Sequence, residues 1–528
     1  MPENHPVLVV GAGPVGLTAA AILLGRGVDV RVIDRAAAPS EFSKALLVWP
    51  RTLEVLRRLG GGPHIAGHGQ DVADFRYYSD GRPILRIPFG TATRPKIIVQ
   101  PDVEAMLHAA LAERGGKPEW HTELTVLTQD TDGVTATIRE PDGVERTHRF
   151  SHVIGADGAG STVRGLLGLD FDGATYPQTF VLGDTAITGT AEPASVHYYC
   201  SPRGVLVLVP LPNGRHRVFT AAPHELTSDD VTLGLLQDLV DARGPGGLRL
   251  HDLSWGAAFR IHARHVEHPR SGRVFLAGDA AHIHSPAGGQ GLNTGVTDAH
   301  NLAWKLAAVW HGDLPEAILD SYETERAAVA RSVVRQAEAQ TRAWLIRKPW
   351  QVTARDLAAG AAARAGLFDR HYVPWLTGTR HEYPHGLTIA PETRGLTRRP
   401  VRHGALVPNF AVTTDGEVWR PIRDVLPDDR YSLLVTVPDG VEPVPGPAFA
   451  ALLRAYPRLI SGWTRTGSLL RPAAGPPGGD LPGRTPGRRI SVTLIRPDHY
   501  VAAHDSDPAL PTITRHLADL TRPGKEEK

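Results

Sequence analysis

The sequence has 528 residues, more than one hydrophobic core usually organises, so two or three domains are expected. Hydrophobic residues make up 41% and charged residues 21%, which is typical of a folded soluble protein and excludes a disordered chain. The formal net charge of +1 gives no electrostatic reason to expect a nucleic acid or an anionic membrane as a partner. Cys200 is the only cysteine, which excludes an intrachain disulfide and a thiolate metal cluster and fits a cytoplasmic protein.

An uncharged run extends from Val7 to Gly25. Its length suggests a membrane helix or a signal peptide, but three glycines and Pro14 interrupt it, and no basic segment precedes it. We expect instead a buried strand over 7–10, a tight turn, a helix over 17–24 and a second strand over 28–33. These elements form a βαβ unit.

The turn of this unit carries the pattern Gly11-x-Gly13-x-x-Gly16. Gly11 permits the tight turn, Gly13 lets the backbone approach a pyrophosphate, and Gly16 lets the helix pack on the strand. The helix N-terminus presents N–H groups and a partial positive charge to the phosphates. Asp34 ends the second strand, where its carboxylate can accept hydrogen bonds from a ribose. The unit predicts dinucleotide binding and leaves both FAD and NAD open.

The middle of the chain alternates between helical and β patterns. We expect helices over 51–59 and from Pro101 to Leu111, antiparallel strands over 70–98, hairpins over 122–154, and a β region over 175–262 that contains a helix near 228–242.

A second glycine-rich segment bears on the nature of the dinucleotide. Residues 273–295 read RVFLAGDAAHIHSPAGGQGLNTG, so a strand leads to Gly278 and Asp279, and a glycine-rich turn then leads into a helix. The N-terminus of that helix would stabilise the negative charge that a reduced isoalloxazine carries near N1 and O2. Asp279 can accept hydrogen bonds from ribityl hydroxyls. The segment therefore favours FAD.

Two long helices are expected next, over about 294–311 and 314–342, and we interpret the charged stretch from Tyr322 to Arg331 as a solvated face. Residues 346–400 are helical in part. From about residue 400 Pro and Gly become frequent, which indicates a separate C-terminal domain. We expect strands in it over 432–437 and 490–495, a loop over 471–489 and a disordered tail over 522–528.

Together these segments resemble the class A flavoprotein aromatic hydroxylases, the p-hydroxybenzoate hydroxylase-like superfamily. Residues 278–279 are similar to the GD motif of that family, and residues 155–164 (GADGAGSTVR) to its DG motif, which serves both FAD and nicotinamide binding there. The three motifs occur in family order within roughly residues 5–345. The C-terminal part, with LIRPDHYVAAH at 494–504, resembles the thioredoxin-like domain of the phenol hydroxylase and aromatic polyketide hydroxylase branch. That domain would be structural, since it contains no cysteine.

The resemblance implies a set of cofactor-binding residues. Asp157 belongs to the DG motif, and Lys44 stands where the family often has an arginine on the pyrophosphate, so it keeps the charge without the planar fork. The other implied residues are Gly11, Gly13, Gly16, Asp34 and Arg35 for the ADP half, Gln100 and Asp279 near the ribityl chain, and Pro286, Gly288, Gly289, Gln290, Gly291, Leu292 and Asn293 along the isoalloxazine.

Three aromatic residues are candidates for the substrate pocket. Trp49 could face the flavin or the substrate, and Tyr198 or Tyr199 could line the pocket from the sheet. Core packing explains each of them at least as well, so both interpretations stay open.

Four histidines could have either a functional or a structural role. His262, His265 and His268 look like a metal cluster, but they lie in a strand-to-loop region without an acidic or cysteine partner, so no metal is expected. His282 matches a family position and is expected to be structural. The serines lack a GxSxG context, which argues against serine hydrolysis.

The resemblance implies a mixed α/β (α+β) fold. A discontinuous, glutathione reductase-like FAD domain would comprise residues 1–70, 99–174 and 263–345, and an antiparallel substrate-binding sheet would comprise 71–98 and 175–262. A helical connection over 346–399 would lead to a thioredoxin-like domain over 400–528. The cofactors would be FAD and NADPH or NADH, and a homodimer is compatible with the resemblance.

The implied reaction is monooxygenation. NAD(P)H reduces FAD, O₂ gives a C4a-hydroperoxyflavin, and one oxygen passes to a phenolic or polycyclic aromatic, polyketide-like substrate, as in antibiotic biosynthesis. The protein would exclude water, orient the ring and favour the phenolate. Baeyer–Villiger insertion, and an FAD-dependent reductase or halogenase on the same fold, also stay open, although the WxWxIP segment of flavin halogenases is absent.

Overall fold

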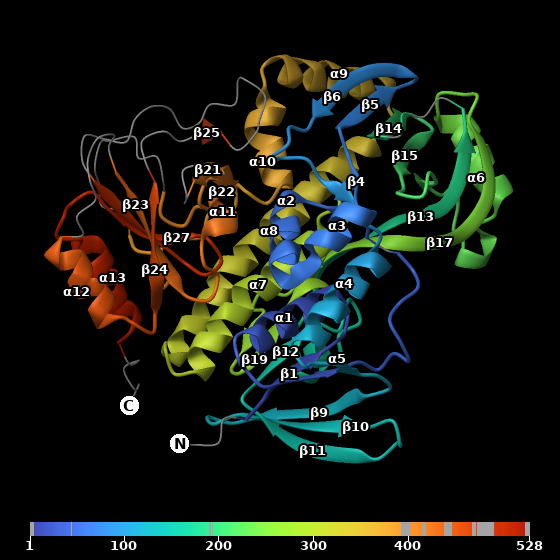
Figure 1. Ribbon diagram of the computed structural model, residues 1–528. Coiled ribbons are helices and arrows are strands. Elements are labelled where there is room, and N and C mark those ends of the chain that lie inside the picture. The colour runs from blue at the N-terminus through green and yellow to red at the C-terminus, as the bar shows by residue number, and fades with distance from the viewer. Residues whose placement is uncertain are drawn as a thin grey trace.

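The computed structural model describes residues 5–43, 45–189, 192, 194–391, 402–413, 419–437, 446–466, 471–472 and 490–522. A central body of helices and a sheet lies between two flanking parts (Figure 1). On one side a long pair of strands, β13 (Asp172–Thr188) and β17 (Arg249–His265), extends outwards, and on the other side lie the C-terminal strands and helices. Over these ranges, no helix combines the length and apolar character needed to cross a membrane.

A six-stranded sheet of order β18-β19-β12-β1-β2-β8 lies in the central body. β1 (Val7–Val10) is completely apolar and buried, and it pairs in parallel with β2 (Val30–Ile33) and β12 (His152–Gly155). β19 (Val274–Leu276) pairs in parallel with β12. Because parallel strands end at the same edge of a sheet, the three segments that follow β1, β12 and β19 lie together. The edge strands are β18 (Arg270–Ser271) and β8 (Pro118–Glu119).

Helices cover this sheet. α1 (Pro14–Gly25) packs against α4 (Gln100–Glu113) and α7 (Gly291–Trp310), and α8 (Asp320–Trp344) packs on α7. The expected helices are confirmed, but the one over 314–342 is divided, because a 3₁₀ turn (Glu316–Leu319) precedes α8. The smaller elements are β3 (Leu47–Val48), α2 (Pro50–Leu56), a π-helical turn (Arg57–Gly61), α3 (Gly62–His68), β4 (Gln70–Asp71), β7 (Lys96–Ile97), β9 (Glu123–Gln129), β10 (Val134–Arg139), β11 (Glu145–Phe150) and α5 (Thr162–Leu166).

The second large sheet has eight strands in the order β20-β17-β13-β16-β15-β14-β5-β6. One of its faces packs under α6 (Leu233–Arg243), and the other packs against α8 and α9 (Pro349–Arg364). Its neighbouring strands are antiparallel except β5 and β14. The remaining strands of this sheet are β5 (Asp74–Ser79), β6 (Arg82–Pro88), β14 (Ser195–Ser201), β15 (Gly204–Pro210), β16 (His216–Ala221) and β20 (His282–Ile283), and a 3₁₀ turn (Ser228–Asp230) precedes α6.

The C-terminal part contains a four-stranded sheet of order β24-β23-β26-β27. The expected strands over 432–437 and 490–495 are confirmed as β23 (Tyr431–Thr436) and β26 (Ser491–Ile495). The loop expected over 471–489 begins with a short strand, and its residues 473–489 and the tail from 523 lie outside the described residues. The other elements are a π-helical turn (Phe368–Tyr372), α10 (Val373–Leu376), β21 (Phe410–Thr413), β22 (Trp419–Pro421), α11 (Ile422–Val425), α12 (Pro447–Ala455), β24 (Ile460–Thr466), β25 (Arg471–Pro472), β27 (Val501–Asp505) and α13 (Pro511–Leu520).

Close contact between α1 and α7 gives a first prediction. A Cβ added at Gly295 of α7 would lie 2.5 Å from Val15 Cγ2 and 3.1 Å from Gly278 Cα, so Gly295→Ala should lower the free energy of unfolding by about 1–3 kcal/mol. Urea denaturation of the apoprotein measures this change. The control is Gly234→Ala on α6, where the nearest atom to the added Cβ is 4.0 Å away. Equal stability of the two variants would contradict close packing at Gly295.

Candidate active site

The first glycine-rich turn leaves one open side. Gly11 has φ +106°, and a Cβ there would lie 2.3 Å from the Ala156 carbonyl oxygen. A Cβ at Gly16 would lie 1.9 Å from the Gly11 oxygen, so both positions exclude any side chain. At Gly13, however, an added Cβ would meet nothing within 4 Å. The turn is therefore packed on its protein side and open at Gly13, where α1 begins without a side-chain cap and where a pyrophosphate can approach.

Asp34, which follows β2, accepts two backbone hydrogen bonds near this turn. Its Oδ2 accepts from the Ala12 N–H at 2.7 Å, and its Oδ1 accepts from the Ala36 N–H at 2.8 Å. Each oxygen keeps a further lone pair, so the half-buried carboxylate can still accept from a ribose hydroxyl. Arg35 follows and is exposed, whereas Lys44 lies outside the described residues.

The second glycine-rich segment meets the first at Val15. A Cβ at Gly278 would lie 2.7 Å from Val15 Cγ2, so the start of the GD-like segment packs directly on the first turn of α1. Gly278 opens a 3₁₀ turn (Gly278–Ala280) in which Asp279 is exposed and Ala280 is buried. The two segments that are distant in sequence therefore form one continuous surface.

A buried carboxylate on α7, Asp298, holds the Gly278 segment in place. Its Oδ2 accepts from the Gly278 N–H at 3.1 Å and from His282 Nε2 at 2.7 Å, and its Oδ1 accepts from Arg326 Nε at 2.6 Å. Burial disfavours ionisation of Asp298, but the charges of Arg326 and His282 outweigh it and lower the pKa of this carboxyl. His282 thus has a structural contact, as its position suggested.

The interpretation of Tyr322–Arg331 as a solvated face is wrong. Glu325 and Arg326 are 2% and 3% exposed, because Glu325 pairs with Lys305 and Arg496, and Arg326 pairs with Asp298. Only their partners elsewhere in the chain make this burial possible, and the local sequence does not reveal them.

Side-chain hydrogen bonds connect the turn over 288–293 to β3 and to the residue that follows it. Asn293 donates from Nδ2 to the oxygens of Leu47 and Gly289, at 2.8 and 2.7 Å, and its Oδ1 accepts from the Trp49 N–H at 2.8 Å. Trp49 is buried, and its Nε1 donates to the Gly288 oxygen at 2.9 Å. Trp49 therefore stabilises this turn through two hydrogen bonds, one from its backbone N–H and one from its indole N–H.

The other residues predicted to lie along the isoalloxazine differ from one another in burial and in contacts. Gln290 donates from Nε2 to the Leu376 oxygen at 2.9 Å, whereas Pro286 is exposed. At Gly291 an added Cβ would meet nothing within 4 Å, and α7 begins there without a side-chain cap. Leu292 is half-buried. The N-terminus of α7 is accordingly available to a bound group.

Two predicted cofactor residues make internal bonds. Gln100 accepts from the Ala45 N–H at 3.2 Å and donates to Glu104 at 2.9 Å, so it orders the loop next to Lys44. Asp157 accepts from Ser161 Oγ at 2.6 Å and from the Val163 N–H at 3.1 Å, so it caps α5. Both contacts shape the edge of the site, and cofactor contact by either residue stays a prediction.

Arg164 links the DG-like and GD-like segments. It donates to the Ala159 oxygen at 2.7 Å and to the Ala280 oxygen at 2.9 Å. The structure therefore brings the three glycine-containing segments together through direct contacts.

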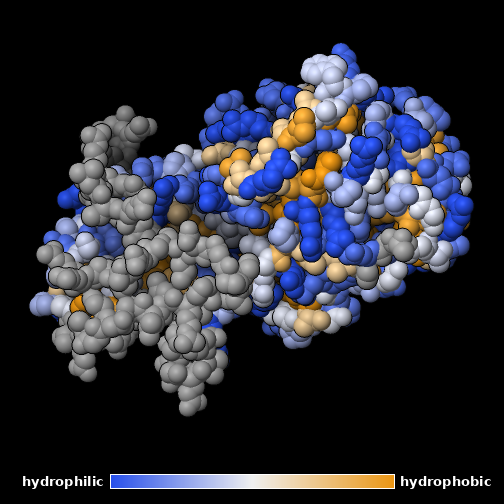
Figure 2. Space-filling model, turned by 90° about the horizontal axis from the view of Figure 1, so that it is seen from above, coloured by the Kyte–Doolittle hydropathy of each residue, from blue (hydrophilic) through white to orange (hydrophobic). Residues whose placement is uncertain are grey.

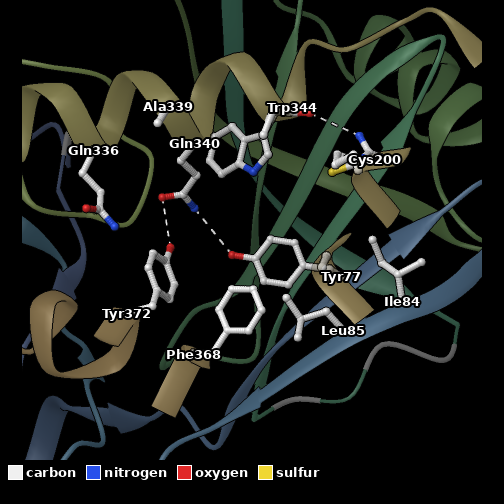
Figure 3. A pocket seen from close by; sticks show the side chains of 13 residues that line it. Tyr77, Ile84, Leu85, Cys200, Gln336, Ala339, Gln340, Trp344, Phe368 and Tyr372 are labelled. Carbon is white, nitrogen blue, oxygen red and sulfur yellow. Dashed lines mark hydrogen bonds between the residues drawn. The ribbon is translucent and has the colours of Figure 1, made fainter. Parts of the chain in front are cut away.

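An apolar cavity of about 240 Å³ lies between the eight-stranded sheet and the helices α8 and α9 (Figure 3). Gln340 of α8 lies between two tyrosines: its Oε1 accepts from Tyr372 Oη at 3.0 Å, and its Nε2 donates to Tyr77 Oη at 3.5 Å. A Cβ added at Gly288 would lie 3.4 Å from Gln340 Oε1, so the cavity adjoins the turn over 288–293. The other labelled lining residues include Ile84, Leu85, Cys200, Trp344 and Phe368.

Burial controls the titration of the polar groups at this cavity. It raises the pKa of Tyr77 and of Tyr372, so both phenols stay protonated at physiological pH. It also raises the pKa of the Cys200 thiol to about 11, which leaves an inert, protonated side chain.

Of the two tyrosines proposed for the substrate pocket, only Tyr198 lies on the cavity side. It stacks on Tyr77 with ring centroids 4.4 Å apart. Tyr199 stacks on Tyr78 and packs with residues of α6, on the opposite face of the sheet. Successive side chains of a strand alternate between faces, so Tyr199 does not line this cavity, and its contact with a substrate stays a prediction.

Two of the three histidines that resembled a metal cluster have separate partners. His262 Nδ1 lies 2.8 Å from Thr175 Oγ1, and His268 Nδ1 lies 2.7 Å from Glu323. In the described part of the chain, no group of three or more His, Cys, Asp or Glu side chains could hold a metal ion.

Known proteins share these features. The FAD binding domain family matches residues 4–337. The 6-methylpretetramide 4-monooxygenase of Streptomyces rimosus is 34% identical over 98% of this chain and 94% of its own. Among solved structures, a ternary complex of aklavinone-11 hydroxylase with FAD and aklavinone has a TM-score of 0.77 at 27% identity, over 99% of this chain and 100% of the other. The anhydrotetracycline hydroxylase OxyS of Streptomyces rimosus has a TM-score of 0.76 at 27% identity, with the same coverage.

The site and the fold define a flavin-dependent monooxygenase, with FAD as its cofactor. The chain belongs to the FAD binding domain family. The predicted likeness to FAD-dependent aromatic hydroxylases is confirmed, as is the mixed α/β fold. NAD(P)H is the usual reductant of such enzymes.

Asp279 gives a direct test of the flavin assignment. Asp279→Ala should raise the dissociation constant of FAD about tenfold or more, because a ribityl hydroxyl would lose a charged acceptor. Fluorescence titration of the apoprotein with FAD measures this change. Asp132→Ala, in an exposed turn between β9 and β10, is the control. Unchanged affinity in the Asp279 variant would refute the assigned contact.

Proposed function

We propose that this monooxygenase hydroxylates an electron-rich polycyclic aromatic of the polyketide type, bound in the cavity beside Gly288. The observation that carries the proposal is the position of an aromatic-lined cavity next to the turn assigned to the isoalloxazine. The relative from Streptomyces rimosus and two structural neighbours, which are named for 6-methylpretetramide, anhydrotetracycline and aklavinone, support the same substrate class.

The residues present fit FAD. The open backbone at Gly13 and the N-terminus of α1 would hold the pyrophosphate, Asp34 the ribose and Asp279 the ribityl chain. The uncapped N-terminus of α7 would stabilise negative charge on the reduced ring. When bound there and reduced by a nicotinamide nucleotide, FAD would supply the electrons that activate O₂. The protein itself would bind the substrate, orient its ring and exclude water from the site.

The polar groups of the cavity would orient the substrate. Tyr77 and Tyr372 both hydrogen-bond to the Gln340 amide, whose Oε1 would lie 3.4 Å from a Cβ added at Gly288 (Figure 3). Tyr372 donates its proton to Gln340 and would hold that amide in place. Burial keeps the Tyr77 phenol protonated, and because its oxygen accepts from Gln340, its own proton would be available to a substrate oxygen and would favour the phenolate. A phenolate ring is a better nucleophile towards electrophilic oxygen, so this contact would promote hydroxylation.

A route for an apolar substrate is also suggested. Seen from above, hydrophobic side chains gather on the face that carries α9 and β6 (Figure 2). Trp350 and Leu357 of α9 are 68% and 67% exposed, whereas Ala359 of the same helix lines the cavity. We propose that the substrate enters past α9.

We also keep the predicted domain division as a proposal. The parallel sheet from 1–70, 99–174 and 263–345 supports a glutathione reductase-like FAD domain, and the sheet from 71–98 and 175–262 supports a substrate domain. In the C-terminal part, β24 runs parallel and β26 antiparallel to β23, with α12 and α13 alongside, which supports a thioredoxin-like module. A homodimer stays a prediction from the resemblance.

Product analysis tests the reaction and the substrate class. The holoenzyme with NADPH under ¹⁸O₂ should add one ¹⁸O to a polycyclic phenol, detected by mass spectrometry. A ring-expanded lactone would instead establish Baeyer–Villiger insertion, a reduced product would favour a reductase, and a halogenated product would favour a halogenase. Absence of substrate-stimulated NAD(P)H oxidation across simple and polycyclic phenols would contradict the proposal.

Tyr77 tests the location of the substrate. Tyr77→Phe should lower kcat/KM by about tenfold to one hundredfold and release more hydrogen peroxide per NADPH, because the substrate oxygen loses a donor. The matched control is Tyr78→Phe, since Tyr78 stacks on Tyr199 on the opposite face of the sheet. If both variants keep wild-type kcat/KM and coupling, the substrate binds elsewhere.

A further inference from the structure

We propose that the C-terminal segment over 490–522 positions the flavin-binding segment: Arg496 and Tyr500 hold Tyr383, Tyr383 holds Arg326, and Arg326 holds the carboxylate that fixes Gly278. This inference rests on the proposed role of the Gly278–Asp279 segment in FAD binding. It gives the C-terminal module a part in cofactor retention.

The link next to the flavin segment is Arg326. Its Nε donates to Asp298 at 2.6 Å, its Nη1 donates to Tyr383 Oη at 3.1 Å, and its Nη2 donates to Thr297 Oγ1 at 2.9 Å and to the Thr294 oxygen at 3.3 Å. All three guanidinium nitrogens are therefore engaged. Loss of the Tyr383 hydroxyl would leave one buried N–H without its acceptor and loosen the orientation of the whole group.

The next link is a pair of stacked rings. Tyr383 stacks on Tyr500 of the C-terminal segment, with ring centroids 4.0 Å apart and an interplanar angle of 23°. The Arg496 guanidinium lies over both rings, 5.1 Å from the Tyr383 centroid and 5.7 Å from the Tyr500 centroid. Both contacts fix the plane of Tyr383 and hence the direction of its hydroxyl.

Arg496 is itself locked by charge. It is completely buried, and it donates to both oxygens of Glu325, at 2.6 and 2.9 Å, and from Nε and Nη2 to Asp498, at 2.9 and 2.6 Å. Lys305 of α7 also donates to Glu325, at 2.8 Å. Such a network holds a single geometry, because any displacement would leave a buried charge unpaired.

Two consecutive residues of α8 connect the two sides. Glu325 faces the C-terminal segment, and Arg326 faces Asp298 and the Gly278 segment. In Figure 1, α8 runs beside α7 between the C-terminal strands and the central body. A shift of the C-terminal segment would therefore move α8 and the flavin-binding segment together.

The test is the rate at which FAD leaves the holoenzyme, followed by flavin fluorescence after dilution. Tyr383→Phe removes only the hydroxyl, so the fold should persist, and we expect dissociation about tenfold faster than in the wild type. The matched control is Tyr431→Phe, another buried tyrosine of the C-terminal part, which should release FAD at the wild-type rate.

Melting temperatures and a further variant separate the outcomes. Faster release from Tyr383→Phe, from an apoprotein that still unfolds in one cooperative transition above the temperature of the release assay, supports positioning. Wild-type release from Tyr383→Phe overturns the inference while leaving the proposed function intact. Wild-type FAD affinity in Asp279→Ala would instead overturn the flavin role of the segment, and this inference with it.

Discussion

The ion pair between Asp298 and Arg326 is the interaction on which the rest of the site depends. Both side chains are buried, and removal of two charges from water is costly unless each finds complete hydrogen bonding. Here the carboxylate accepts from a backbone N–H, a histidine and the arginine. The backbone N–H belongs to Gly278, so the same bonds that satisfy the charge also fix the start of the segment to which we assign flavin binding.

Close backbone contacts transmit this constraint to the rest of the site. Gly278 and Gly295 leave room for the side chain of Val15 on α1. This contact fixes the second glycine-rich segment relative to the first. Arg164 attaches the third segment through the Ala280 oxygen. The dinucleotide site that we propose is thus formed by three strand ends that have little freedom to move relative to one another. A preorganised site of this kind lowers the ordering cost of binding the cofactor.

Sequence patterns predicted the parts of this structure that local physics determines. Gly11 and Gly16 could be predicted because a tight turn and a helix contact exclude a side chain there. Gly13 leaves open backbone, where we propose that a phosphate approaches. The apolar run at 7–10 likewise predicts a buried strand. Asp298, Arg326 and Arg496 were missed because their burial depends on partners far along the chain. The polar positions Asp298, His300, Asn301 and Lys305 in an otherwise apolar helix were the available signal for this network.

The FAD content of an Asp298→Asn variant tests most directly whether this ion pair holds the flavin site together. Asparagine keeps the size of the side chain but removes the charge, so Arg326 and His282 would lose their common charged acceptor and Gly278 its fixed position. We expect a folded protein, by circular dichroism, that is purified with much less FAD per chain than the wild type. A folded Asp298→Asn variant with the full wild-type FAD content would contradict the role given to this ion pair.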